Sequence, residues 1–169
     1  MGPRASVDRL KVLFLSCGGL GFAPVAPEVL ATLAGAGLAL ALGLSDHYLL
    51  WAVVVGVLIY AGARSLGTWC EEQSGRRDPG YFVIGEALGY LVSVLWVTGP
   101  SLLTLVVAFF LVRLFSVLAL PPVPRLKLVP GADGILLGKL ASGLWGLALL
   151  TLGRFLFPEL PWIVAPVAV

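Results

Sequence analysis

The stretch Asp78-Pro79-Gly80-Tyr81-Phe82-Val83-Ile84-Gly85-Glu86 decides how this chain folds, because a polar turn leads directly into an apolar helix. Glu86 lies about one turn inside that helix. An ionisable group at membrane depth is energetically costly, which makes it a candidate for a functional role. Two interpretations of Glu86 are open. It is a metal ligand or a general acid/base, or it reaches the membrane interface or pairs with Arg113 or Lys139.

The composition around this stretch is that of a membrane protein. Of the 169 residues, 59% are hydrophobic and only 12% are charged, whereas soluble domains carry about 25% charged residues. We therefore expect an integral membrane protein with a single domain over residues 1–169 and no nucleic-acid partner. The two cysteines, Cys17 and Cys70, form no CxxC pair and are expected to be reduced and structural.

Apolar runs predict an all-α bundle of about five transmembrane helices. The predicted ranges are 29–44, 48–66, 83–98, 101–120 and 135–157. The first and third runs are shorter than the roughly 20 residues that span a bilayer. Glycines and prolines before the first helix, at 20–26, predict a re-entrant or broken backbone segment there. Gly138, Ser142 and Gly146 recur every four residues and predict a packing seam on the last helix.

Basic residues concentrate on one side of the predicted bundle. Successive connections alternate across the membrane, so one side receives the N-terminus and the connections 67–82 and 121–134. Ten of the eleven lysines and arginines fall there or at nearby helix ends, and only Arg154 lies on the other side. An excess of positive charge marks the cytoplasmic side. We therefore predict a cytoplasmic N-terminus and a candidate site on the cytoplasmic face.

Four basic residues near that face are candidates for binding a phosphate group. Arg76 and Arg77 belong either to a solvated loop or to a site for an anionic lipid phosphate. Arg113 suits a phosphate or carboxylate partner. Lys139, one turn inside the last helix, either extends to the interface or takes part in the site. Glu28 either favours the start of the first helix or lies in a loop that lines a headgroup site.

Several blocks, taken in order, resemble the phosphatidylglycerophosphatase A family of bacterial membrane proteins. The segment 19–27 is similar to GxGxxPxxPGTxGT, and 78–89 is similar to DPGxxVxDExxG. Arg113-Leu114-Phe115-Ser116 is similar to RxFD, and 131–143 is similar to GGxGIMxDDxxAG. The resemblance implies Mg²⁺-dependent removal of phosphate from phosphatidylglycerophosphate, in a multi-pass protein of the bacterial inner membrane.

The chain departs from that pattern where the family carries its acids. The DE pair is Gly85-Glu86 here, the acid of RxFD is Ser116, and the DD pair is Gly138-Lys139. Four of the five acids expected in the helical motifs are absent, and one position is basic. Losing carboxylates and gaining Lys139 weakens the field that would hold a divalent cation, and Lys139 could pair with Glu86 instead.

The leading hypothesis is therefore a degenerate homologue with lost or reduced phosphatase activity. It would act as a lipid-binding or complex-forming subunit, with membrane lipids, an anionic phospholipid, a membrane protein or another copy of itself as partners. The alternative is an active lipid phosphatase in which Glu86 works with Asp78 or Asp133. In both hypotheses Arg113, Arg76, Arg77 and Lys139 are the candidate phosphate-binding residues, and any Mg²⁺ would bind at Glu86.

Overall fold

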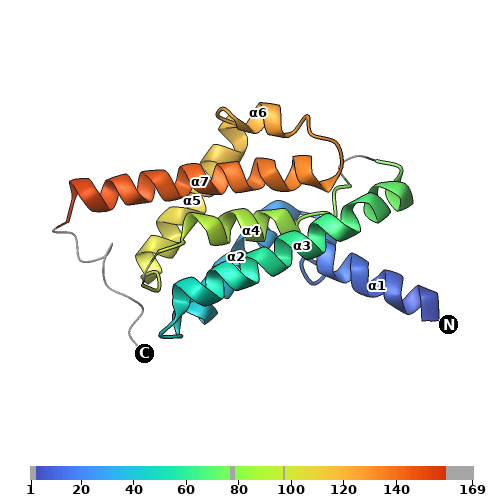
Figure 1. Ribbon diagram of the computed structural model, residues 1–169, viewed down its shortest axis with the longest axis horizontal. Helices are drawn as coiled ribbons and strands as arrows, with labels where there is room; N and C mark the ends of the chain where they lie inside the picture. Colours follow the sequence, from blue (N-terminus) through green and yellow to red (C-terminus); the bar gives the residue numbers. More distant parts are fainter. Residues whose placement is uncertain (1–2, 77–78, 97, 159–169) are drawn as a thin grey trace.

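The computed structural model describes residues 3–76, 79–96 and 98–158, and within these ranges it is all-helical, without strands. The elements are α1 (Pro3–Leu15), the 3₁₀ turn η1 (Leu20–Phe22), α2 (Pro27–Gly43), α3 (Tyr48–Ser74), α4 (Ile84–Ser93), α5 (Leu102–Leu118), α6 (Val123–Leu126) and α7 (Ala132–Leu156) (Figure 1). The five predicted helices correspond to α2, α3, α4, α5 and α7. Helices α1 and α6 were not predicted.

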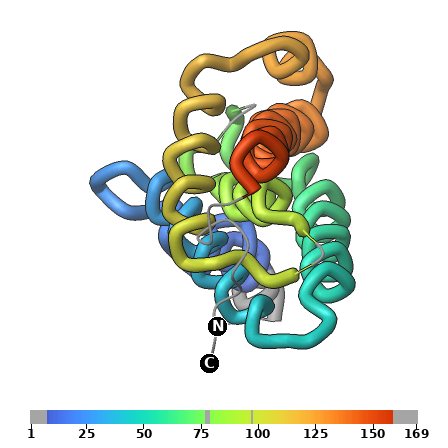
Figure 2. The backbone as a smooth tube through the Cα atoms, turned by 90° about the vertical axis from the view of Figure 1, so that its left-hand side faces the viewer, coloured from blue at the N-terminus to red at the C-terminus, as the bar shows by residue number. Residues whose placement is uncertain are grey.

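Helix α4 lies at the centre of the molecule, surrounded by α2, α3, α5 and α7 (Figure 2). Every residue of α4 except Val92 is buried. Its ten residues make a helix only about 15 Å long, half the thickness of a bilayer core. The third predicted helix is thus short and covered by its neighbours.

The prediction that this helix continues to residue 98 is wrong, because α4 ends at Ser93. The Tyr48 hydroxyl donates a hydrogen bond of 2.9 Å to the carbonyl of Val94. A carbonyl at a helix end has no partner within the helix, so this bond lets α4 stop in the protein interior. The Tyr90 hydroxyl similarly donates to the Leu105 carbonyl at 2.6 Å, joining α4 to α5.

Helix α3 continues to Ser74, beyond the predicted end at residue 66. Its last turns are polar on one side, which hid them from a search for apolar runs. On the other side Ala63 and Cys70 are buried in a cluster with Leu15, Phe82 and Leu136. Tertiary packing therefore extends the helix past the apolar run.

The backbones of α4 and α7 lie close together because both helices carry a glycine at their contact. A Cβ atom added at Gly143 would collide with the carbonyl of Gly89, so only a residue without a side chain fits there. A Cβ atom added at Gly146 would lie 3.1 Å from Cβ of Ser93. The predicted seam of small residues on α7 is therefore real at Gly146, but Gly138 packs against Lys127 instead.

Between α1 and α2 the backbone is irregular, as the glycines and prolines predicted. Cys17, Gly18 and Gly19 have positive φ angles of 54°, 74° and 97°, and Ala26 has φ 45°. The Ser16 hydroxyl accepts a hydrogen bond from the Gly19 amide at 3.0 Å. The chain reverses direction here after α1, and Leu15 lies against the turn before α4.

Two helices, α3 and α7, are long and apolar enough to cross a membrane, while α2 and α5 are apolar but 17 residues each. Only 11% of the apolar window of α3 is buried, so α3 is not the core helix of a soluble protein. Its exposed apolar side chains include Leu50, Trp51 and Leu58. A large exposed apolar face of this kind suits contact with lipid.

Candidate functional site

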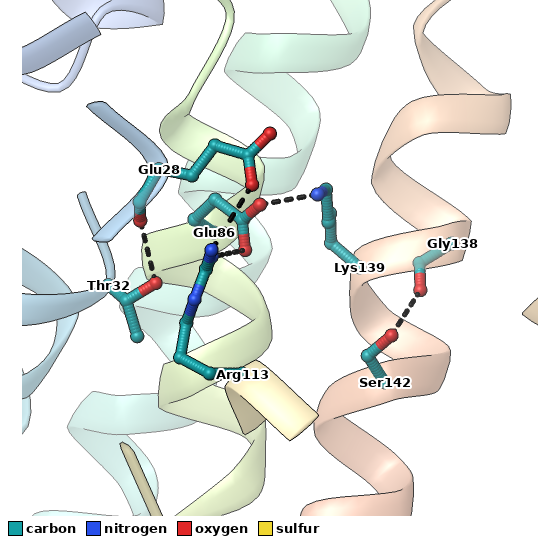
Figure 3. Close-up of polar contacts among 7 residues, drawn as sticks. All are labelled: Glu28, Thr32, Glu86, Arg113, Gly138, Lys139 and Ser142. Atoms are coloured by element: carbon teal, nitrogen blue, oxygen red, sulfur yellow. Dashed lines mark hydrogen bonds and ion pairs between the residues drawn. The ribbon is translucent and has the colours of Figure 1, made fainter. Parts of the chain in front are cut away.

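Glu86 occupies the first turn of α4 and is 2% exposed. Its side chain lies between α2 and α5 on one side and α7 on the other (Figure 3). Burying a carboxylate this completely is stable only if its charge is compensated. Glu86 is therefore closed off from the surface of the protein, and the geometry of its partners decides the character of the site.

Two cations compensate Glu86. The Lys139 ammonium hydrogen-bonds Oε1 directly, and Arg113 Nη1 lies 3.7 Å from Oε2. Arg113 also reaches Glu28, with Nη2 at 3.4 Å from Glu28 Oε2 (Figure 3). The predicted pairing of Glu86 with Lys139 and Arg113 is thus present. Glu28 lies in the first turn of α2, as its first interpretation predicts, and not in a loop.

The two glycines that stand in place of expected acids are each covered by a lysine. A Cβ at Gly85 would lie 3.3 Å from Cγ of Lys139. A Cβ at Gly138 would lie 3.2 Å from Cγ of Lys127. The space beside each glycine is therefore taken by the aliphatic part of a lysine side chain.

Three buried polar atoms around this cluster have no hydrogen-bond partner among the described residues. They are Glu86 Oε2, Arg113 Nη1 and Ser116 Oγ. The first two face each other at 3.7 Å, which is an ion-pair distance but too long for a hydrogen bond. Arg113 therefore keeps an unused donor beside the carboxylate, and Ser116 adds a hydroxyl one turn further along α5.

The remaining candidates do not join the cluster. Asp133, the proposed second acid, accepts a hydrogen bond from the Tyr60 hydroxyl at 2.9 Å and pairs with Arg64 Nε at 3.2 Å. Arg76 is exposed in the turn after α3 and makes no ion pair with a described residue. Arg77 and Asp78 lie outside the described residues, as does most of the C-terminal segment 158–169.

The residues described do not fit a Mg²⁺ site. Magnesium takes oxygen ligands in near-octahedral geometry, and no group of three His, Cys, Asp or Glu residues lies together in this part of the chain. Both oxygens of Glu86 face cationic groups. A divalent ion at Glu86 would have to displace the Lys139 ammonium and lie next to the Arg113 guanidinium, which like-charge repulsion opposes.

The turn that opens α4 is held against the irregular segment before α2. The Val83 amide donates to the Leu15 carbonyl at 3.1 Å, and the rings of Phe22 and Tyr81 stack with centroids 5.4 Å apart. Burial, followed by the hydrogen bond with Cys70, raises the pKa of Tyr81 to about 12. These contacts bring two segments separated in sequence together and fix where α4, and hence Glu86, begins.

Lys127 packs against Gly138, a contact that sequence reasoning missed because it counted Lys127 only among the cytoplasmic charges. The signal was available at Gly138, because a glycine in place of an acid leaves room for a long neighbouring side chain. The partner could not be named from sequence, since α6 was not predicted. The proline-rich connection places Lys127 over α7 only through the tertiary fold.

Comparison with known proteins agrees with the blocks quoted above. No curated protein and no solved structure matches the chain. The family model for phosphatidylglycerophosphatase A matches residues 13–154, which include the irregular segment, Glu86, Arg113 and Lys139. The match covers most of the chain, including all of the helices from α2 to α6 and nearly all of α7. The chain therefore belongs to the phosphatidylglycerophosphatase A family.

Proposed function

We propose that this phosphatidylglycerophosphatase-like protein is a degenerate member of its family that binds the phosphate of an anionic phospholipid without a metal. Its Mg²⁺-dependent phosphatase activity is lost or strongly reduced, and it serves as a lipid-binding or complex-forming membrane subunit. The observation that carries this proposal is Lys139, whose stem covers Gly85 and whose ammonium binds Glu86.

The charges at the site favour an anion over a divalent cation. Glu28 and Glu86 are balanced by Arg113 and Lys139, which leaves no net negative charge to attract a divalent cation. Arg113 Nη1 has no hydrogen-bond acceptor among the described residues. Since a guanidinium binds phosphate oxygens with charge-assisted hydrogen bonds and the Arg113 side chain is partly exposed, Arg113 is the main candidate to hold the headgroup.

The proposed location of the protein in the cell is based on the distribution of its basic residues and on its family. The distribution of basic residues supports a multi-pass protein of the bacterial inner membrane with a cytoplasmic N-terminus. The site would then meet lipid headgroups of the cytoplasmic leaflet, where anionic lipids attract basic side chains.

Binding of short-chain phosphatidylglycerol to purified protein in detergent tests this proposal, with titration calorimetry in EDTA and in Mg²⁺. We expect the same affinity in both buffers and about a tenfold loss in Arg113→Gln. Arg125→Gln is the matched control, because Arg125 is exposed on α6 and makes no ion pair with a described residue. Binding that requires Mg²⁺ would contradict the proposal.

The alternative is an active phosphatase that converts phosphatidylglycerophosphate to phosphatidylglycerol. One observation favours it: Glu28 and Glu86 converge on the same guanidinium, so two carboxylates lie near each other. Phosphate release from phosphatidylglycerophosphate with Mg²⁺ separates the hypotheses. We expect no release above that of Glu86→Ala, whereas robust release that disappears in Glu86→Ala would establish the enzyme.

A further inference from the structure

An apolar groove of about 250 Å³ opens between α3, α4 and α7, away from the Glu86 cluster. Its walls include Gly56, Val57, Tyr60, Leu88, Leu91 and Leu140. Because α3 and α4 run in opposite directions, Tyr60 lies at the Leu88 end and Ala52 lies at the Leu95 end. The groove therefore follows the helices lengthwise along a face on which α3 exposes its apolar side chains.

The Tyr60 end of the groove is polar and cationic. The Tyr60 hydroxyl donates to Asp133 Oδ1 at 2.9 Å, and Arg64 Nε lies 3.2 Å from the same oxygen. Arg64 is one turn beyond Tyr60 on α3, and its side chain is 63% exposed. Asp133 thus engages the Nε edge of the guanidinium and orients it, leaving the two terminal amino groups for another acceptor.

We propose that this groove is a second lipid site, which takes one acyl chain of an anionic glycerophospholipid whose phosphate binds Arg64. An apolar slot ending at a positioned guanidinium complements a molecule that is apolar along its length and anionic at one end. The volume is below the roughly 300–1,000 Å³ of pockets that enclose whole ligands. The groove therefore holds part of one chain, and the remainder of the lipid lies in the bilayer.

This site is separate from the one proposed around Glu86. Glu86 and Leu88 are two residues apart on α4 and so point in nearly opposite directions. Both sites use α4 and α7, but the Glu86 cluster is completed by α2 and α5, whereas the groove is completed by α3. The two sites can therefore be removed independently, and failure of one does not imply failure of the other.

Native mass spectrometry of protein released from nanodiscs containing phosphatidylglycerol and phosphatidylcholine tests the proposal by counting bound lipids. Gly56→Phe should fill the groove and remove one bound lipid, since a Cβ there would already contact Leu88 and Leu91 at 3.7 and 3.8 Å. Gly37→Phe is the matched control, because Gly37 is an exposed helical glycine with no atom within 4 Å of an added Cβ. Helix content by circular dichroism confirms folding of both variants.

Arg64→Gln tests whether Arg64 binds the lipid headgroup. It disturbs packing less than Gly56→Phe does, because Arg64 is exposed. We expect the preference for phosphatidylglycerol over phosphatidylcholine at this site to fall about tenfold, with Arg125→Gln unchanged. Arg113→Gln should keep the groove lipid while losing the lipid of the Glu86 site. The proposal is overturned if folded Gly56→Phe retains every lipid, or if Arg64→Gln keeps the wild-type preference. A dimer that Gly56→Phe dissociates without loss of lipid would instead identify the groove as a contact between copies.

Discussion

At the scale of single residues, Glu86 shows how a buried charge is retained in this fold. Its carboxylate is nearly inaccessible, yet a cation lies against each oxygen. Removing one partner of a buried ion pair is more harmful than replacing both, because an uncompensated charge remains. Lys139 is therefore expected to support stability as well as phosphate binding.

Lys139→Met should lower the free energy of unfolding by about 3 kcal/mol, because Glu86 would keep only the longer contact with Arg113. Thermal or denaturant unfolding in detergent measures this change. Glu86→Gln combined with Lys139→Met should recover most of the loss. Lys127→Met is the control and should change stability by no more than about 0.5 kcal/mol, since Lys127 is exposed and makes no ion pair with a described residue. Equal losses in both lysine variants would refute a special role for the pair with Glu86.

The raised pKa of Tyr81 predicts that the stability of the turn before α4 depends on pH. Burial raises its pKa from the ordinary value of 10 to about 12, so folding favours the protonated phenol. Its stabilising contribution is fully present below pH 10 and is lost as the pH rises from 10 to 12. Melting temperatures across this range should fall more steeply for wild type than for Tyr81→Phe. Parallel curves for the two proteins would show that Tyr81 does not control the transition.

At the scale of elements, α4 depends on its neighbours because it is too short and too buried to be stable alone. Its closest contact is with α7, where Gly89 and Gly143 bring the two backbones together. Such contacts arise from packing, since lipid provides no hydrophobic drive between helices. Substitutions at this contact should therefore separate α4 from α7 and disturb the site that both helices form.

Gly143→Leu should destabilise the protein by about 3 kcal/mol, because its Cβ would collide with the Gly89 carbonyl. The variant should also lose phosphatidylglycerol binding, since Glu86 and Lys139 lie on the separated helices. Gly153→Leu on the same helix is the control, because no atom lies within 4 Å of a Cβ at Gly153. Unfolding of the two variants in detergent measures the difference, and similar values would contradict a close α4–α7 contact.

At the scale of the whole molecule, α3 is long enough to define a membrane orientation. Its 27 residues extend about 40 Å, which exceeds the roughly 30 Å of a hydrocarbon core. Its C-terminal end lies at the same end of the molecule as the start of α7 (Figure 1). The predicted orientation places that end in the cytoplasm.

Cysteine labelling can test this orientation. In a background lacking Cys17 and Cys70, Asp46→Cys and Glu72→Cys should react with an impermeant maleimide from opposite sides of the membrane. Both positions are exposed and lie near the two ends of α3. In intact cells Asp46→Cys should label and Glu72→Cys should label only after the membrane is opened. Labelling of both in intact cells would exclude α3 as a membrane-spanning helix.

The sequence by itself determined the helical class, the approximate positions of five helices, the irregular segment before α2 and the candidate residues Glu86, Arg113 and Lys139. These properties depend on local composition and short-range pattern, as in the apolar runs and the glycine-rich segment. The exchange of acids for Gly85, Ser116, Gly138 and Lys139 was likewise visible from motif positions alone.

Only the tertiary structure decided which of these residues meet. Helix α4 ends at Ser93 because of its tertiary contacts. The lysines Lys139 and Lys127 pack over Gly85 and Gly138. Asp133 pairs with Arg64 and Tyr60 and not with Glu86. Each outcome depends on contacts between helices far apart in sequence, which local patterns do not encode. The physical reason is that charge pairing and close packing are set by distances in space. A carboxylate one turn inside a helix therefore becomes an internal ion pair or a metal ligand according to what the neighbouring helices bring to it.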